Sequence, residues 1–406
     1  MCFVTVPHPL GMISKEEVNA KVDAAFDDIV KAATAWTPSK EKQDAQVKPY
    51  PAKRFKFSGT YADVNDMFQK RKWSLSLPIV PPTVDKVAAM LKGTKRNPAE
   101  VLWVVPPRQG MLTVELVAAL GVMAGAKPEH MPLLIATVEA MADPVAAWRG
   151  PTTTTAATMP VFFISGPIID KLKLNPGTGT AGGENPVTNA LGYFVNLVGD
   201  VVGGSVPPNF DKSTHGSSAD LVAMVFTENA KENPWKTTYA EEAGFKPGDS
   251  IVTHFSAYLG NANIDHDSKT GQRLLTTLST GLLGSASGLA SCLADYDATY
   301  AINNKVSFAF IVLCPEHAAT IAKDFPDQRA ARDFMRETAA MPYKFYSQET
   351  CVPGKDFGPY DENTFIPRFK KTESIKFFVS GGPGKQSQIW VPFPQVFKPV
   401  SKKIAE

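Results

Sequence analysis

Apolar residues recur at helical spacing between residues 15 and 34, so that one face of this segment, from Val18 to Val30, is predicted to be buried. Ser14 followed by Glu17 is the capping-box pattern that begins a helix. A short β-type run, Cys2–Val6, precedes it. A single strand and helix cannot bury this face alone. Residues 1–36 are therefore predicted to form an N-terminal arm that docks on the rest of the chain or on a partner.

The periodic pattern stops after the arm. Residues 38–59 hold six Lys or Arg, three Pro and few aliphatic side chains, which is typical of a solvated linker and less often of a polybasic contact site. We predict a basic, Pro-containing linker at 37–60 and a main body at 61–406. A division of the body into two lobes near 205–220 is left open.

In the main body, apolar runs of strand length alternate with segments of helical period. The predicted strands are Leu77–Val80, Val101–Val105, Val161–Ile164, Leu221–Phe226, Ile251–His254, Val306–Leu313 and Ile375–Val379. The predicted helices are Thr83–Leu91, Thr113–Ala124, Pro128–Ala142, Pro186–Val198, Gly271–Leu283, Glu316–Ala322 and Gln328–Thr338. Pro81-Pro82 and Pro106-Pro107 are predicted strand-to-helix corners. This alternation indicates an α/β fold: a mostly buried mixed or parallel sheet with helices on both faces.

Composition narrows the classes of function. The formal net charge of +2 lacks the basic field that nucleic-acid binding needs, so no nucleic-acid partner is expected. No apolar run reaches the roughly 20 residues of a membrane span, and no signal peptide is seen at the start, so we expect a cytoplasmic protein without a membrane partner. Four Cys in 406 residues suit a reducing compartment.

Two glycine-rich loops could bind an anion through backbone N–H groups. The run 177–182 has the spacing G-x-G-x-x-G, but Ile168–Leu174 separates it from the preceding strand, which argues against a dinucleotide fold. The second loop directly follows the predicted strand Ile375–Val379 and does not fit a Walker A motif. The candidate substrate-binding residues are Gly179, Thr180, Gly182, Gly183, Gly381, Gly382 and Lys385. A lid or plain turn chemistry is the alternative for both loops.

The densest group of reactive side chains follows the strand Val306–Leu313. Cys314, Glu316 and His317 place a thiol, a carboxylate and an imidazole at the start of a helix, where His317 could act as a base or metal ligand. The alternative is an ordinary helix start. The other candidates are Glu228 and Arg108, which follow two further strands, and His215, which lies in a polar loop and could join His317 as a metal ligand.

Several of these segments together resemble a bacterial family whose members are fused to, or encoded beside, the UGSC domain. That domain is named for a selenocysteine/cysteine motif and is related to the selenoprotein B reductases. The resemblance rests on Leu77–Thr83, Val104–Arg108, Val122–Glu129, Cys314–Ala318 and Gly381–Lys385. It implies redox or thiol-assisted chemistry, and it likens the N-terminal arm to the last strand and helix of a UGSC domain. The U-G-S-C motif itself is absent, and Leu75-Ser76 stands where the family has Asp-Gly.

The sequence thus supports two hypotheses. In the first, the chain is an enzyme, an oxidoreductase or lyase, that acts on a small polar, anionic substrate. Its acid/base residues, or a bound transition metal, lie at the strand ends. In the second, it is a non-catalytic partner or scaffold subunit whose N-terminal arm completes another chain's domain. Homo-oligomerisation through the arm is compatible with both.

Overall fold

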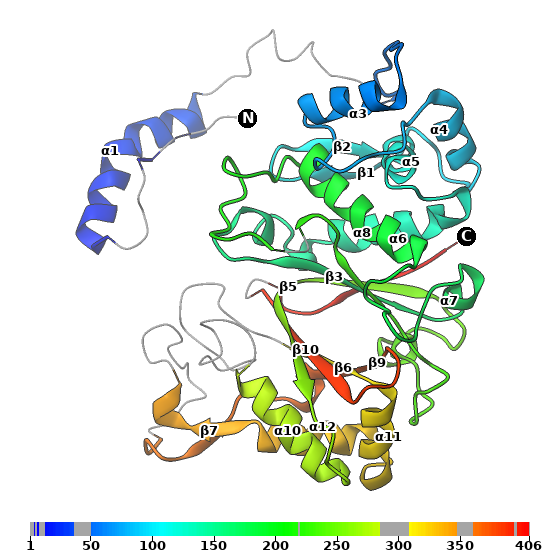
Figure 1. Ribbon diagram of the computed structural model, residues 1–406. Helices are drawn as coiled ribbons and strands as arrows, with labels where there is room; N and C mark the ends of the chain where they lie inside the picture. Colours follow the sequence, from blue (N-terminus) through cyan, green and yellow to red (C-terminus); the bar gives the residue numbers. More distant parts are fainter. Residues whose placement is uncertain are drawn as a thin grey trace. The chain divides into compact units, whose positions relative to one another are not determined.

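The computed structural model describes residues 4, 6–7, 13–35, 50–217, 220–284, 308–346, 360–393 and 396–405 (Figure 1). The chain divides into two compact units, Met1–Lys48 and Pro49–Glu406. In the first, α1 spans Lys15–Thr34 and begins with the predicted capping box, in which the Ser14 hydroxyl accepts the Glu17 amide and the Glu17 carboxylate accepts the Ser14 amide. The predicted helix is confirmed. Most of the strand predicted before it lies outside the described residues.

The second unit is built on a seven-stranded mixed sheet with the order β4-β3-β5-β10-β6-β9, in which β11 also pairs with β5. The strands are β3 (Met159–Ser165), β4 (Met224–Thr227), β5 (Ile251–Ile264), β6 (Ala309–Leu313), β9 (Ile375–Val379), β10 (Gln386–Pro392) and β11 (Val400–Lys403). β3 is parallel to β4 and β6 is parallel to β9, whereas the other pairs are antiparallel. The same topology therefore occurs twice: two parallel strands followed by one antiparallel strand.

Aromatic side chains show that the sheet curls strongly. The rings of Phe163 on β3 and Phe310 on β6 stack at 4.5 Å, although two strands separate β3 from β6 in the sheet. Phe163 also meets Phe378 of β9 at 5.0 Å. At one end the two outermost strands are joined by an isolated bridge between Glu228 and Ser380. The inner face of the sheet is thus filled by its own apolar side chains.

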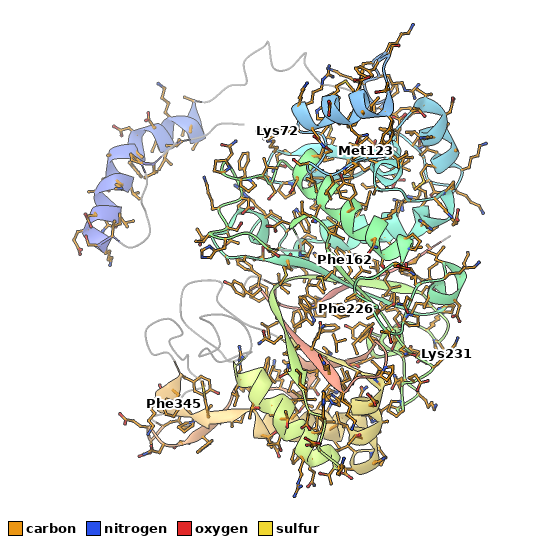
Figure 2. All side chains as sticks on the ribbon, in the orientation of Figure 1. Lys72, Met123, Phe162, Phe226, Lys231 and Phe345 are labelled. Atoms are coloured by element: carbon orange, nitrogen blue, oxygen red, sulfur yellow. The ribbon has the colours of Figure 1, made fainter. Side chains whose placement is uncertain are left out.

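Helices cover the other face of the sheet in two groups (Figure 1). One group packs on β3, β4 and β5 and contains α5 (Val114–Met123), α6 (Met131–Ala142) and α8 (Pro186–Asn196). The other packs on β6, β9 and β10 and contains α10 (Gly271–Gly284), α11 (Pro315–Asp324) and α12 (Gln328–Thr338). In Figure 2, Phe162 belongs to the first helix-facing cluster and Phe226 to the inner face. The predicted α/β fold with a mixed sheet is confirmed. The two helix groups do not cover both faces of the sheet as predicted, because the sheet curls and its own apolar side chains fill the inner face.

Shorter elements complete the second unit. A hairpin of β1 (Val101–Val105) and β2 (Gly110–Thr113) and a small pair of β7 (Ala340–Pro342) and β8 (Phe365–Pro367) lie outside the main sheet. The remaining helices are α3 (Tyr61–Lys70), α4 (Val84–Leu91), α7 (Ile168–Lys171), α9 (Tyr239–Glu242) and the π-helix η4 (Leu197–Val202), together with 3₁₀ turns. None of the helices in the described ranges is long and apolar enough to cross a membrane.

Three local predictions are wrong, one of them the strand-to-helix corner at Pro81-Pro82, which is not preceded by a strand. Leu77–Val80 is not a strand, because its backbone is held by single bonds, such as the Ile79 amide to Asn65 Oδ1, rather than by a neighbouring strand. Pro106-Pro107 lies in the turn of the β1–β2 hairpin and not in a strand-to-helix corner. The sequence analysis also missed two strands of the sheet. β10 pairs with the second half of β5, and β11 pairs with its first half. Most of the predicted linker falls at 36–49, outside the described residues.

Candidate functional site

Four of the strands end at one edge of the curled sheet. Ser165 is the last residue of β3, and Glu228, Cys314 and Ser380 directly follow β4, β6 and β9. The Glu228 amide donates to the Ile164 carbonyl at 2.9 Å, and the Ser380 amide donates to the Leu313 carbonyl at 2.9 Å. Together with the Glu228–Ser380 bridge, these bonds join the four strand ends in a row, which we call the strand-end seam. The structure therefore brings the predicted residues Glu228 and Cys314 to the same edge.

Glu228 is almost fully buried in the seam, with 2% of its surface exposed. Its carboxylate accepts hydrogen bonds from the Ser165 hydroxyl and, at 2.7 Å, from the Tyr239 amide. The Ser165 oxygen in turn accepts from the Ala240 amide at 3.1 Å. Burial raises the pKa of Glu228 to about 6, against the opposing effect of these two hydrogen bonds. Glu228 and Ser165 thus satisfy the first amides of α9 and anchor that helix to the strand ends.

Glu316 and His317, which follow β6, hold the loop between β9 and β10 by hydrogen bonds. The Glu316 carboxylate accepts from the amides of Gly384 at 2.6 Å and Lys385 at 2.9 Å, and these bonds lower its pKa. His317 is buried, with Nδ1 2.8 Å from the Ser387 hydroxyl and Nε2 3.1 Å from the Asp265 carbonyl. Burial lowers the pKa of His317 and raises that of Cys314. The imidazole is therefore hydrogen-bonded at both nitrogens, and burial disfavours both its protonated form and the thiolate form of Cys314.

The two glycine-rich loops lie against each other. The Gly381 amide donates to the Pro176 carbonyl at 2.9 Å, and Gly382 fits so closely that a Cβ atom there would lie 2.0 Å from the Thr178 hydroxyl. Thr180 is buried, and its hydroxyl lies 2.9 Å from that of Thr227. Thr180 and Gly182 donate their amides to carbonyls of their own loop. Gly179 and Gly183 have positive φ and are exposed at its surface.

The side chains of three other predicted residues form none of these hydrogen bonds. Arg108 is in the β1–β2 turn, where its amide donates to the Gly203 carbonyl at 2.8 Å and its guanidinium lies 6.0 Å from the Phe210 ring centroid. The Lys385 ammonium donates to the His266 carbonyl at 2.8 Å. His215 is exposed in a loop. In the described part of the chain, no group of three His, Cys, Asp or Glu side chains could hold a metal ion, so His215 and His317 form no such group.

A cavity of about 90 Å³ lies at the opposite end of β3, next to Pro160, and the sequence analysis missed it. Its chemically distinctive lining residues are Trp148, Asn196, Asp200, Asp211, Asp220 and Ser256. We call it the Asp200 cavity. Asp200 belongs to the π-helix η4, a rare element that is often found at functional sites. The signal available in the sequence was a single carboxylate within the otherwise apolar run 197–202.

Three carboxyl groups line this cavity and interact electrostatically with one another. Burial raises the pKa of Asp200 to about 8, and the charges of Asp220 and Asp211 add to the effect. Burial also raises the pKa of Asp220. Asp211 accepts the Ser213 amide at 2.8 Å and Asp220 accepts the Ser217 amide at 2.6 Å. Within the described ranges, no Lys, Arg or His forms a salt bridge with any of the three carboxylates.

Two larger hollows differ from the Asp200 cavity because their acidic groups are paired with cations. In a hollow of about 600 Å³, Glu242 forms ion pairs with Arg332 and Lys376. In another of about 470 Å³, Asp143 pairs with Lys402 at 2.8 Å. Perturbed, uncompensated ionisable groups in a cavity mark a candidate functional site. Comparison of the chain with models of known protein families, and with curated proteins, finds no match.

Proposed function

We propose that this chain is an enzyme that acts on a small polar molecule by acid–base chemistry in the Asp200 cavity. The observation that carries the proposal is a carboxyl group, Asp200, that has a pKa of about 8, lies in a polar cavity and forms no salt bridge with any described residue. A carboxylic acid that stays protonated near neutral pH can donate a proton to a leaving group. Such general acid catalysis contributes roughly a factor of 10² to 10⁴ to a rate.

A lyase-type elimination fits this arrangement. The bond to the leaving group breaks as Asp200 gives its proton to the departing atom. A second carboxylate of the cavity takes a proton from the adjacent carbon, and the electron pair of that C–H bond forms the new double bond. Two carboxyl groups in different environments commonly divide these roles. The resemblance to the UGSC-associated family favours redox or lyase chemistry, and of the two the lyase reaction uses the groups of this cavity directly. Glu228 in the seam and Glu316 and His317 in α11 then position loops and helices instead of reacting.

The test compares Asp200→Asn with Glu228→Gln. Both variants remove a carboxyl group of raised pKa, but Glu228 lies in the seam. Each purified protein is incubated with a panel of small amino and hydroxy compounds, and loss of substrate is followed by NMR. We expect the natural chain and Glu228→Gln to convert the same compound, and Asp200→Asn to be at least about 100-fold slower. Full activity of a folded Asp200→Asn protein would refute the proposal.

A second candidate function, that of a partner or self-associating subunit, is favoured by α1. Its side chains Val22, Phe26, Ile29 and Val30 are 39–56% exposed, a continuous apolar face on one helix. We propose that this face associates with a second copy of the chain. The test is sedimentation of the full chain and of Phe26→Asp, with Asp27→Lys as the control on the same helix. A dimer that only Phe26→Asp dissociates supports association, and a monomeric natural chain at high concentration contradicts it.

A further inference from the structure

We propose that the hollow of about 600 Å³ beside Glu242 binds a small aromatic carboxylate. We call it the Lys376 hollow. It shares no described lining residue with the Asp200 cavity, so this inference goes beyond the proposed function and does not depend on it. Two observations carry it: an excess of cations around the hollow, and a wall of aromatic side chains.

The Lys376 hollow lies at one end of the inner face of the curled sheet. Tyr239 and Phe308 line the hollow and belong to the cluster that fills this face. Lys376 is the second residue of β9, in which Phe377 belongs to the helix-facing cluster and Phe378 to the inner face. Because side chains alternate along a strand, Lys376 shares the inner face with Phe378. The hollow therefore places an ammonium group next to aromatic side chains.

The carboxylates that line the hollow do not leave it negatively charged. Glu242 pairs with Arg332 and, at 3.6 Å, with Lys376. The other two lining carboxylates each pair with a cation of their own, in the pairs Asp143–Lys402 and Glu373–Arg329. Every described carboxylate of the lining is thus compensated by an ion pair.

Lys398 adds a positive charge that no carboxylate compensates. It lines the hollow, and within the described ranges its ammonium group forms no salt bridge. Its charge nevertheless reaches the lining: the hydrogen bond from Lys402 lowers the pKa of Asp143, and the charge of Lys398 adds to this effect.

The balance of these groups selects an anion. Five cations surround the three lining carboxylates, because Glu242 has two partners and Lys398 has none. The side chains of Lys376 and Glu242 are only 22% and 15% exposed, so water and salt screen the charges here less than on an open surface. An anion would be attracted to the hollow, and a further cation would be repelled.

Aromatic side chains supply the apolar part of the site. The described lining includes Tyr239, Phe245, Phe308 and Phe397. Tyr239 and Phe308 are buried, whereas Phe397 is 47% exposed. A flat apolar ligand that packs on Phe397 would remove this ring from water. The volume falls within the range of about 300–1,000 Å³ of ligand pockets, which combine apolar walls with a few charged groups.

Together these features fit an aromatic ring that carries a carboxylate. The ring would pack on Phe397, and the carboxylate would accept hydrogen bonds from Lys376 or Lys398, whose ammonium groups can only donate. Among the described residues, no three carboxylate, imidazole or thiolate groups are placed to hold a metal ion instead. Phenylacetate, in which one carbon separates the ring from the carboxylate, is the appropriate probe.

Calorimetric titration of the full chain with phenylacetate at pH 7 measures the affinity. We expect saturable binding of one molecule per chain. Phenylacetamide has the same shape without the charge, and acetate has the charge without the ring, so each should bind at least tenfold more weakly. Absence of saturable binding, equal affinity for phenylacetamide, or tighter binding of phenethylamine would overturn the inference.

Lys398→Met tests the role of charge, because Lys398 is exposed and its replacement leaves the three carboxylates paired. The affinity for phenylacetate should fall at least fivefold. Lys403→Met is the matched control: it removes the same charge from a residue that pairs with Asp249 and does not line the hollow, and it should leave the affinity unchanged. Equal losses in the two variants would assign the binding to the net charge of the protein and overturn the inference.

Phe397→Ala tests the role of the ring. Phe397 and Phe365 are both exposed, but of the two only Phe397 lines the hollow. Phe397→Ala should weaken binding of phenylacetate at least fivefold, whereas Phe365→Ala should not alter it. Asp200→Asn should bind phenylacetate as the natural chain does. A loss of binding in that variant would place the ligand in the Asp200 cavity and overturn the inference.

Discussion

Replacing Asp200 by Asn should stabilise the protein, and the gain should grow with pH. The pKa of this carboxyl is about 8 in the folded chain, against 3.8 for its ordinary value. Below pH 3.8 the group is protonated in both states and has no effect. As pH rises from about 4 to about 8, the unfolded chain loses the proton and the folded chain retains it, so stability falls. The slope is about 1.4 kcal/mol per pH unit.

At pH 7 this amounts to a destabilisation on the order of 4 kcal/mol by the ionisable carboxyl, which the amide of Asp200→Asn removes. Such a cost is typical of a site kept for function. The assay is urea unfolding followed by tryptophan fluorescence at pH 5, 6, 7 and 8, on the natural chain and the variant. The difference in unfolding free energy should rise steadily over this range.

The matched control is Asp249→Asn, because the pKa of Asp249 is lowered by its bond to Lys403. A lowered pKa contributes stability that is present above pH 3.8 and lost below it, so the difference for this variant should be constant between pH 5 and pH 8. A difference for Asp200→Asn that is equally constant would refute the claim that Asp200 is held protonated, and with it the acid–base proposal.

Three further predictions concern the strand-end seam and its loops. Gly382→Ala should lower the stability of the protein by on the order of 1–3 kcal/mol, because the new Cβ would lie 2.8 Å from the Thr178 backbone nitrogen. Gly182→Ala is the control and should change stability little, because a Cβ there meets no atom within 4 Å. Thermal unfolding compares the two variants. Glu228→Ala should lower the free energy of unfolding by about 3 kcal/mol, because it leaves an amide of α9 unpaired, and Glu228→Gln should lower it clearly less. Urea unfolding measures both losses, and equal losses would contradict the anchoring role. Cys314 should resist iodoacetamide at pH 7.5 until denaturant is added, because its thiol is buried and the pKa of that thiol is raised. Peptide mass mapping measures the labelling, and rapid labelling of the native chain would disprove this prediction.

The secondary structure of this chain could be predicted largely from its local pattern. Helix α12 and strand β9 begin and end at the predicted residues, because each has a periodicity that identifies its buried face. β11 could not be found in this way: its residues, Val400–Lys403, are mostly polar, and they become a strand because β5 offers them hydrogen-bond partners.

The candidate site depended on the tertiary structure to a greater degree. That Glu228 and Cys314 follow strands was visible in the sequence, and the sheet does bring them to one edge. Their chemistry was not visible, because it depends on whether the neighbours that fold against them use their hydrogen bonds, as Ser165 and Tyr239 do for Glu228. For Asp200 the reverse holds: the sequence analysis did not select it, and the folded structure raises its pKa. The sequence by itself determined most of the strands and helices, since those follow from local periodicity. The fold decided which carboxyl groups are satisfied and which are brought together in a cavity, since desolvation and charge repulsion arise only between residues that meet in space.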